Sequence, residues 1–248
     1  MDCDGIARWY RFFEYFAFGR ALERRRLEYL EAVADARSVL ILGDGDGRFT
    51  AEFVKRNPRA AVQFVDLSSK MVELAKCRVS ETAGVRFRVG DARTIALDGN
   101  YDLVVSHFFL DCFTESELAE LVATISACCV PGARWLVSEF GLPAGGVGRF
   151  AARVLIRVMY FFFWVVTGLK VTRLPAYAPV LARNGFQMVR RQTAVGGLLM
   201  SELFGSQRDH GVDAGGAPGG EPGGKKRRTT NDGRSGGDCE GIEGTDSV

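Results

Sequence analysis

Hydrophobic residues along this chain fall into short runs that alternate with amphipathic stretches. Runs of four to eight Val, Ile and Leu residues between turn signals are typical of buried strands, and the stretches between them suit helices that cover a sheet. Helices are expected over residues 68–80 and 114–129. The first five runs are predicted to be strands of one parallel sheet: 38–42, 62–65, 85–89, 101–106 and 134–140.

Two more runs follow, at residues 186–192 and 198–204, and they are separated by a Gly-Gly turn at Gly196 and Gly197. A short glycine turn between two strands is typical of an antiparallel hairpin. The pattern therefore predicts an α/β fold, with a Rossmann-like, seven-stranded, mostly parallel sheet, a terminal antiparallel hairpin and helices on both faces.

The regions outside this alternation define the expected domains. Residues 1–37 are predicted to form an N-terminal helical cap, and residues 38–204 the sheet domain, with a helical insertion at 145–180. Residues 205–248 contain 13 glycines and no aromatic residue. Such a segment buries too little apolar surface to offset its ordering entropy, so a disordered tail is expected.

Composition narrows the function only slightly. A net charge of +2 gives no argument for nucleic acid, and six cysteines without a C-x-x-C pair indicate no metal site. The longest apolar run, residues 158–169, is too short to cross a bilayer. We therefore expect a cytoplasmic protein.

A glycine-rich stretch follows the first predicted strand: Gly43, Asp44, Gly45, Asp46 and Gly47. Bare backbone leading into a helix lets a ligand lie directly against the chain and meet the amides of the helix N-terminus. A dinucleotide fingerprint requires glycine at position 48, which is Arg, and a calcium loop requires an acidic residue at position 55, which is Lys. Neither motif is therefore present.

Acidic residues follow the next two strands. "FVDLS" places Asp66 and Leu67 at the end of the second strand, and "RVGDAR" places Asp91 and Ala92 at the end of the third. The carboxylate of Asp66 can accept hydrogen bonds from both hydroxyls of a ribose. The carboxylate of Asp91 can accept one from the exocyclic amine of adenine, with the Ala92 amide nearby.

The G-x-G-x-G loop followed by these two acids resembles the ordered motifs of the class I S-adenosylmethionine-dependent methyltransferases, over roughly residues 38–204. Within that superfamily the chain looks most like the small-molecule branch that includes quinone-biosynthesis enzymes. The resemblance implies S-adenosyl-L-methionine as cofactor. The residues it implies for cofactor binding are Gly43, Asp44, Gly45, Asp46, Gly47, Asp66, Leu67, Asp91, Ala92 and His107.

One position departs from the family pattern. Family members usually carry an acidic residue two places before the first glycine, and here that residue is Ile41. We hypothesise that Asp44 or Asp46 replaces it as the partner of the cofactor's ammonium group, because a desolvated ammonium requires a carboxylate. The alternative is a pair of solvated loop aspartates.

The fourth strand ends at His107, where this family faces the methyl group. An imidazole titrates near neutral pH, so His107 is a candidate general base, with Asp111 four residues later to orient it or to act itself. The alternative is a structural histidine whose backbone touches the cofactor.

Aromatic residues are concentrated at 9–16 and 160–164, in two segments expected to cover the crevice. They predict an apolar or aromatic small-molecule acceptor, although plain core packing explains most of them equally well. Arg149, Arg153 and Arg157 share one helical face. This face predicts either weak, peripheral association with a membrane surface through residues 149–169 or a solvated cationic face.

Two other functions remain open at this point. The loop also resembles that of the aminopropyltransferases, which share the fold but usually have aspartate where His107 stands. A non-catalytic partner protein that keeps the nucleotide pocket is the second alternative.

Overall fold

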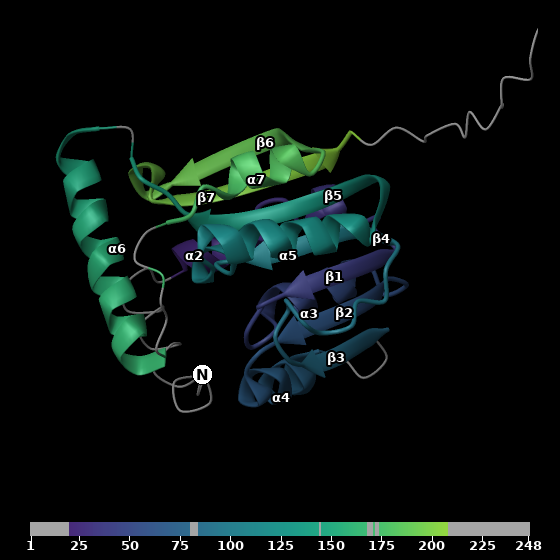
Figure 1. Cartoon of the computed structure of the whole chain (residues 1–248). Helices are drawn as coiled ribbons and strands as arrows, with labels where there is room; N and C mark the ends of the chain where they lie inside the picture. The colour runs from purple at the N-terminus through teal and green to yellow at the C-terminus, as the bar shows by residue number, and fades with distance from the viewer. Residues whose placement is uncertain (1–19, 80–83, 144, 168–170, 172–173, 208–248) are drawn as a thin grey trace, which may run out of the picture. The chain divides into compact units, whose positions relative to one another are not determined.

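The computed structural model contains one sheet, whose seven strands follow the order β3-β2-β1-β4-β5-β7-β6 (Figure 1). The structure describes residues 20–79, 84–143, 145–167, 171 and 174–207, which all belong to one compact unit of the chain. The strands are β1 Ser38–Leu42, β2 Ala61–Asp66, β3 Val85–Val89, β4 Tyr101–His107, β5 Cys129–Phe140, β6 Phe186–Ala194 and β7 Leu199–Ser206.

The first five strands are parallel and the last two form the predicted antiparallel hairpin. β1 lies in the interior of the sheet and pairs in parallel with β2 and β4. β7 lies between β5 and β6 and is antiparallel to both. The predicted fold class is therefore confirmed, and the carboxyl ends of β1 to β5 meet at one edge of the sheet.

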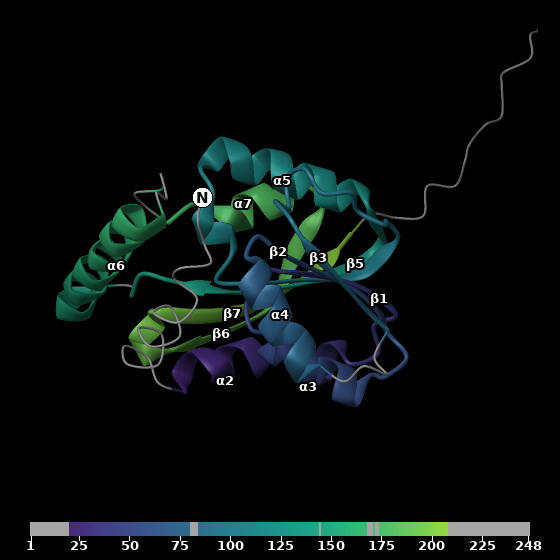
Figure 2. The same ribbon diagram turned by 90° about the horizontal axis from the view of Figure 1, so that it is seen from below.

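Helices cover both faces of the sheet (Figure 2). One face carries α2, α3 and α4, and the opposite face carries α5 and α7. The helices are α2 Ala21–Leu27, α3 Arg48–Arg56, α4 Ser69–Arg78, α5 Glu115–Ala127, α6 Gly146–Thr167 and α7 Tyr177–Arg183. Short 3-10 turns occur at η1 Glu31–Val33, η2 Leu110–Cys112 and η3 Val195–Gly197.

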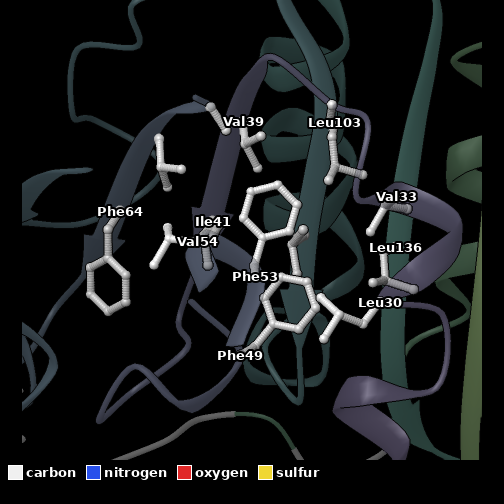
Figure 3. Packing of buried hydrophobic residues seen from close by; sticks show 14 of the residues in the cluster. Leu30, Val33, Val39, Ile41, Phe49, Phe53, Val54, Phe64, Leu103 and Leu136 are labelled. Atoms are coloured by element: carbon white, nitrogen blue, oxygen red, sulfur yellow. The ribbon is translucent and has the colours of Figure 1, made fainter. Parts of the chain in front are cut away.

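The first core fills the space between β1 and α3 (Figure 3). Val39 and Ile41 point toward this face, because side chains alternate along a strand, and they meet Phe49 and Phe53 of α3. Leu40 and Leu42 point to the opposite face and enter the second core. Burial on both faces explains why β1 is a continuous apolar run.

The second core lies under α5 and α7. Four buried residues of α5 recur at helical spacing, and Trp135 of β5 packs in the same cluster. They are Leu118, Leu121, Val122 and Ile125. The helix begins with a capping box in which Thr114 and Glu117 bond each other's backbone amides, so its start is fixed locally.

A third cluster attaches α6 to the rest of the structure. Ala152 and Ile156 of α6 are buried with Phe108, which follows β4, and with Phe140 at the end of β5. Leu22 of α2 belongs to the same cluster. The first half of α6 therefore packs beside the carboxyl ends of β4 and β5.

Five strands extend beyond their predicted ends: β2 by one residue at each end, β4 by one residue, β6 and β7 by two residues and β5 by five. β5 begins at Cys129 rather than at residue 134. Pro131 and Gly132 disfavour a strand in the sequence, but Cys129 pairs with Tyr101 of β4 and so belongs to the sheet. β7 continues to Ser206, into the segment expected to be a tail. Residues 1–19 of the expected cap and residues 208–248 of the expected tail lie outside the described residues. Among the helices that the structure describes, none is long and apolar enough to span a membrane.

Candidate functional site

The strand register brings the predicted site residues to one edge. Leu42 is level with Val65 on one side and with Ser106 on the other, and Asp66 is level with Val89. The segments that follow β1, β2, β3 and β4 therefore lie next to one another. These segments hold the glycine loop, Leu67, Asp91 with Ala92, and Asp111.

The glycine loop is held in shape by the protein's own packing. Gly43, Gly45 and Gly47 all have left-handed backbone angles, with φ of 64°, 61° and 76°. A Cβ on Gly43 would lie 2.5 Å from the ring of Phe109, and a Cβ on Gly47 would lie 2.7 Å from the Cβ of Ala75. These two positions therefore exclude side chains because of neighbouring residues, a reason that the sequence does not reveal.

Gly45 differs from the other two glycines. The nearest atom to a Cβ at this position would be the sulfur of Met71, at 3.9 Å. The Gly45 amide donates to the Asp66 carboxylate over 3.1 Å. Gly45 is therefore the glycine of the loop beside which space remains for a ligand.

Asp44 is buried and binds the start of α3. Its carboxylate accepts hydrogen bonds from the Thr50 amide at 2.9 Å, the Thr50 hydroxyl at 2.7 Å and the Phe49 amide at 3.4 Å. Burial raises the pKa of Asp44 to about 6, against the opposing effects of Arg26 and of these hydrogen bonds. Asp44 is therefore a buried residue that stabilises the start of α3, not a solvated loop residue. Its role toward an ammonium group stays a prediction.

Asp46 is also buried, and it joins the loop to α4. Its carboxylate accepts from Arg78 at 2.9 Å and from Arg48 at 3.2 Å, and its carbonyl oxygen accepts from Arg78. Asp46 therefore fixes the loop between two helices.

Asp66 lies at the end of β2 with both carboxylate oxygens engaged by the backbone. One oxygen accepts from Gly45 and the other from the Ser68 amide at 2.9 Å. Burial raises the pKa of Asp66. A carboxylate offers about four acceptor positions, so at least one remains after the contacts with the amides of Gly45, Ser68 and Leu67. Leu67 follows with 44% of its surface exposed, which leaves an apolar side chain beside these positions.

Asp91 and Ala92 follow β3. Arg93 donates to both Asp91 oxygens, and this pairing lowers the pKa of the carboxyl. Arg93 also contacts Glu117 of α5. Asp91 is half-buried and Ala92 is buried. The contacts of Arg93 with Asp91 and Glu117 therefore hold the turn after β3 in place.

His107 is buried at the end of β4, on the face that carries α3. Its ring packs edge-on against Phe49 with 4.8 Å between ring centroids. Neither ring nitrogen has a hydrogen-bond partner within the described part of the chain. Burial and the nearby Arg26 guanidinium hold the pKa of His107 well below its usual value.

The structure does not join His107 to Asp111 by a hydrogen bond, since both ring nitrogens lack partners among the described residues. Asp111 instead lies close enough to Glu139 of β5 to raise the pKa of that carboxyl. Glu139 follows Ser138, which is level with His107, so the alternation of β5 directs the Glu139 side chain to the opposite face of the sheet from His107. The predicted pair is therefore divided between two faces.

Glu139 is a residue that sequence reasoning missed. It is 1% exposed, and one carboxyl oxygen accepts from the amides of Phe109 at 3.0 Å and Leu110 at 2.8 Å. Because the Phe109 ring covers Gly43, Glu139 holds in place a segment that touches the glycine loop. Burial and Asp111 raise the pKa of Glu139 well above its usual value. The sequence pattern that could have pointed to Glu139 is an acidic residue next to the end of a predicted strand, in "SEF".

The comparisons with known proteins point to one class. Residues 39–132 match the model of a methyltransferase domain family. The chain is 34% identical over 104 residues to a malonyl-[acyl-carrier protein] O-methyltransferase of Priestia megaterium, a match that covers 42% of this chain and 37% of that protein. The enzyme of the same name from Halalkalibacterium halodurans is 31% identical over 123 residues, covering 48% and 43%. The chain thus spans less than half the length of these curated relatives.

A solved structure shows the same fold. The N-methyltransferase NodS from Bradyrhizobium japonicum, crystallised with S-adenosyl-L-homocysteine, has a TM-score of 0.56 and 14% sequence identity to this chain. The alignment covers 75% of this chain and 88% of that one.

The fold and the strand-end motifs define a methyltransferase-type α/β domain. With the family-model match at residues 39–132, they make the chain similar to the class I S-adenosylmethionine-dependent methyltransferases in fold and in the sequence of that segment. The cofactor of this superfamily is S-adenosyl-L-methionine. The quinone-biosynthesis-like branch stays a prediction.

The residues present fit that cofactor. The open side of Gly45, the remaining acceptor capacity of Asp66 and the exposed Leu67 lie at the ends of β1 and β2, where a ribose and the apolar face of a base would be held. At the next strand end, Ala92 carries an amide that could meet the polar edge of a base, whereas Asp91 would have to exchange a contact with Arg93 to accept from it, so the role of Asp91 stays a prediction. Among the described residues, no cluster of His, Cys, Asp or Glu could hold a metal ion.

We predict that Gly47→Ala destabilises the fold much more than Gly45→Ala. Both variants force alanine into a left-handed conformation, which costs about 1–2 kcal/mol. Only Gly47→Ala also places a Cβ 2.7 Å from Ala75, and such overpacking adds about 1–3 kcal/mol. Urea unfolding measures both free energies. Equal losses in the two variants would show that contact with α4 does not constrain the loop.

We predict that Glu139→Gln flattens the pH dependence of stability. The pKa of Glu139 is raised in the folded state, so its stabilising contribution is present below the unfolded pKa and is lost as the pH rises through the folded pKa. Glutamine keeps an oxygen acceptor for Phe109 and Leu110 and cannot ionise. Between the unfolded and the folded pKa, the variant should gain up to about 1.4 kcal/mol over wild type per pH unit, and above the folded pKa the difference should stay constant. Thermal unfolding between acidic and alkaline pH tests this, and parallel profiles would contradict it.

Proposed function

We propose that this protein transfers a methyl group from S-adenosyl-L-methionine to a small acceptor with an apolar or aromatic body. The observation that supports this most is the placement of Gly45, Asp66 and Leu67 at adjoining strand ends, with one open backbone position, one carboxylate with remaining acceptor capacity and one exposed apolar side chain. This arrangement matches the ribose and base of the cofactor.

The residues around the cofactor bind and orient it rather than react with it. Asp66 would hold the ribose hydroxyls, Leu67 would cover one face of the base, and Asp91 with the Ala92 amide would meet its polar edge. The cofactor supplies an electrophilic methyl group when bound. Alignment of an acceptor with that group lowers the barrier without a covalent step on the protein.

The acceptor side is apolar. Phe108 and Phe140 pack at the ends of β4 and β5 with ring centroids 5.0 Å apart, and α6 packs over them. The curated relatives are named as O-methyltransferases of a malonyl group on a carrier protein. We therefore propose an oxygen of an acyl or aromatic compound as the methylated atom.

His107 and Asp111 remain the proposed catalytic residues, but the surroundings of His107 limit what it does. Burial and Arg26 disfavour the imidazolium, so taking a proton from the acceptor costs free energy. An acceptor oxygen that is already ionised at neutral pH avoids this cost. A carboxylate on an apolar body fits both the apolar surface and the buried, neutral imidazole.

We predict that S-adenosyl-L-methionine and its demethylated product bind the wild-type protein and that Asp66→Ala weakens both. Loss of charge-assisted hydrogen bonds worth about 1.5–3 kcal/mol corresponds to a Kd that is weaker by about 10- to 150-fold. Calorimetry measures the Kd, and the thermal midpoint without ligand reports separately on the fold, because Asp66 also accepts from Gly45 and Ser68.

A matched control is Asp98→Ala, which removes a carboxylate that pairs with Arg86 and Arg88 outside the proposed site. It should leave the Kd unchanged. No heat with either nucleoside would remove the proposed function altogether. Labelled methyl transfer to a panel of carboxylic acids and phenols then tests the acceptor, and activity only with the decarboxylated cofactor would favour an aminopropyltransferase.

A further inference from the structure

Helix α6 carries an apolar row that is exposed to solvent. Phe150, Val154 and Val158 follow one another at four-residue spacing, and 71%, 46% and 52% of their surfaces are exposed. Residues at this spacing lie on one side of a helix. An outward-facing side of a solvated helix is normally polar, so this row requires an explanation.

The buried side of α6 lies opposite the apolar row. Ala152 and Ile156 pack into the third cluster, and at 100° per residue they are about half a turn away from Val154. α6 is therefore attached to the domain by one side and presents its apolar row away from it. Packing within the described domain does not account for the exposure of Phe150.

A row of arginines runs beside the apolar row. Arg149, Arg153 and Arg157 are exposed, and the helix contains no acidic residue between positions 146 and 167. The helical period places this row between the buried side and the apolar row. Cationic side chains thus flank the apolar surface along at least two turns.

We infer that α6 docks on a membrane surface containing anionic lipids, with Phe150, Val154 and Val158 inserted among the acyl chains and the arginine row bound to the lipid phosphates. Charge selects this occupant, because an apolar row bordered by three cations matches an apolar layer bordered by anions. The long arginine side chains reach outward to the phosphates while their stems remain on the apolar side.

Membrane docking adds a lipid partner to the proposed function, and the biological meaning of the docking rests on that proposed function. A helix that packs against Phe108 and Phe140 on its inner side and against lipid on its outer side would place the acceptor site at the membrane, where apolar carboxylates collect. Lipid binding is measured without cofactor or acceptor. A failure of binding and a failure of methyl transfer are therefore distinguishable.

The test is co-sedimentation of the full chain with vesicles of phosphatidylcholine alone and with vesicles of equal parts phosphatidylcholine and phosphatidylglycerol. We expect binding to the mixed vesicles, with weakening as salt is added. Arg153→Gln combined with Arg157→Gln should lower the partition constant about 30-fold, since each basic residue near an anionic surface contributes about 1 kcal/mol. Phe150→Ser combined with Val154→Ser should also weaken binding, at unchanged thermal midpoint.

The matched control is Arg59→Gln combined with Lys76→Gln, which removes two exposed cations from other elements. If the control variant lost as much vesicle binding as the arginine-row variant, the inference would be overturned, because binding would then follow net charge alone. No binding by the full chain would also overturn it. A concentration-dependent dimer in light scattering that Phe150→Ser abolishes would assign the apolar row to a second copy instead.

Discussion

The left-handed turn between β1 and α3 is the constraint on which the rest of the site depends. Three residues with positive φ in a span of five reverse the chain so tightly that Gly47 touches Ala75 of α4 and Gly43 touches Phe109 after β4. These contacts fix the loop against its neighbours on both sides. Asp44 and Asp46 then use their carboxylates to hold α3 and α4 rather than to face solvent. The loop is thus shaped before any ligand arrives.

Much of the fold could be predicted from the sequence because each strand satisfies a local rule. β1 and β3 begin and end at their predicted residues, and the glycine pair at 196 and 197 marks the hairpin. The position of β7 between β5 and β6 could not be predicted, because strand order depends on which edges pair, and a one-dimensional pattern carries no such information. The first half of β5 could not be predicted either, because proline disfavours a strand locally and the pairing with β4 overrides that preference at Pro131.

The sequence predicts which residues form the candidate site but not the contacts that hold them. Asp66 and Asp91 are predicted site residues because acids at consecutive strand ends form an ordered pattern. Glu139 was missed because its importance comes from amides of Phe109 and Leu110, 29 or 30 residues away in the chain. The proposed pairing of His107 with Asp111 relied on four-residue spacing, which brings side chains together on a helix. Here a strand end and a 3-10 turn separate them, so that spacing has no such effect.

Charge divides the edge of the sheet into two regions with different chemistry. At β2 and β3, Asp66 and Asp91 are partly accessible and can meet the hydroxyls and amine of a nucleoside. At β4 and β5, His107 and Glu139 are fully buried, and burial moves the pKa of each toward the neutral form. An acceptor that is polar along its whole length would lose its water beside these strand ends and meet apolar side chains such as Phe108 and Phe140. An acceptor with an apolar body would lose little, so the burial at these strand ends supports the proposed apolar acceptor.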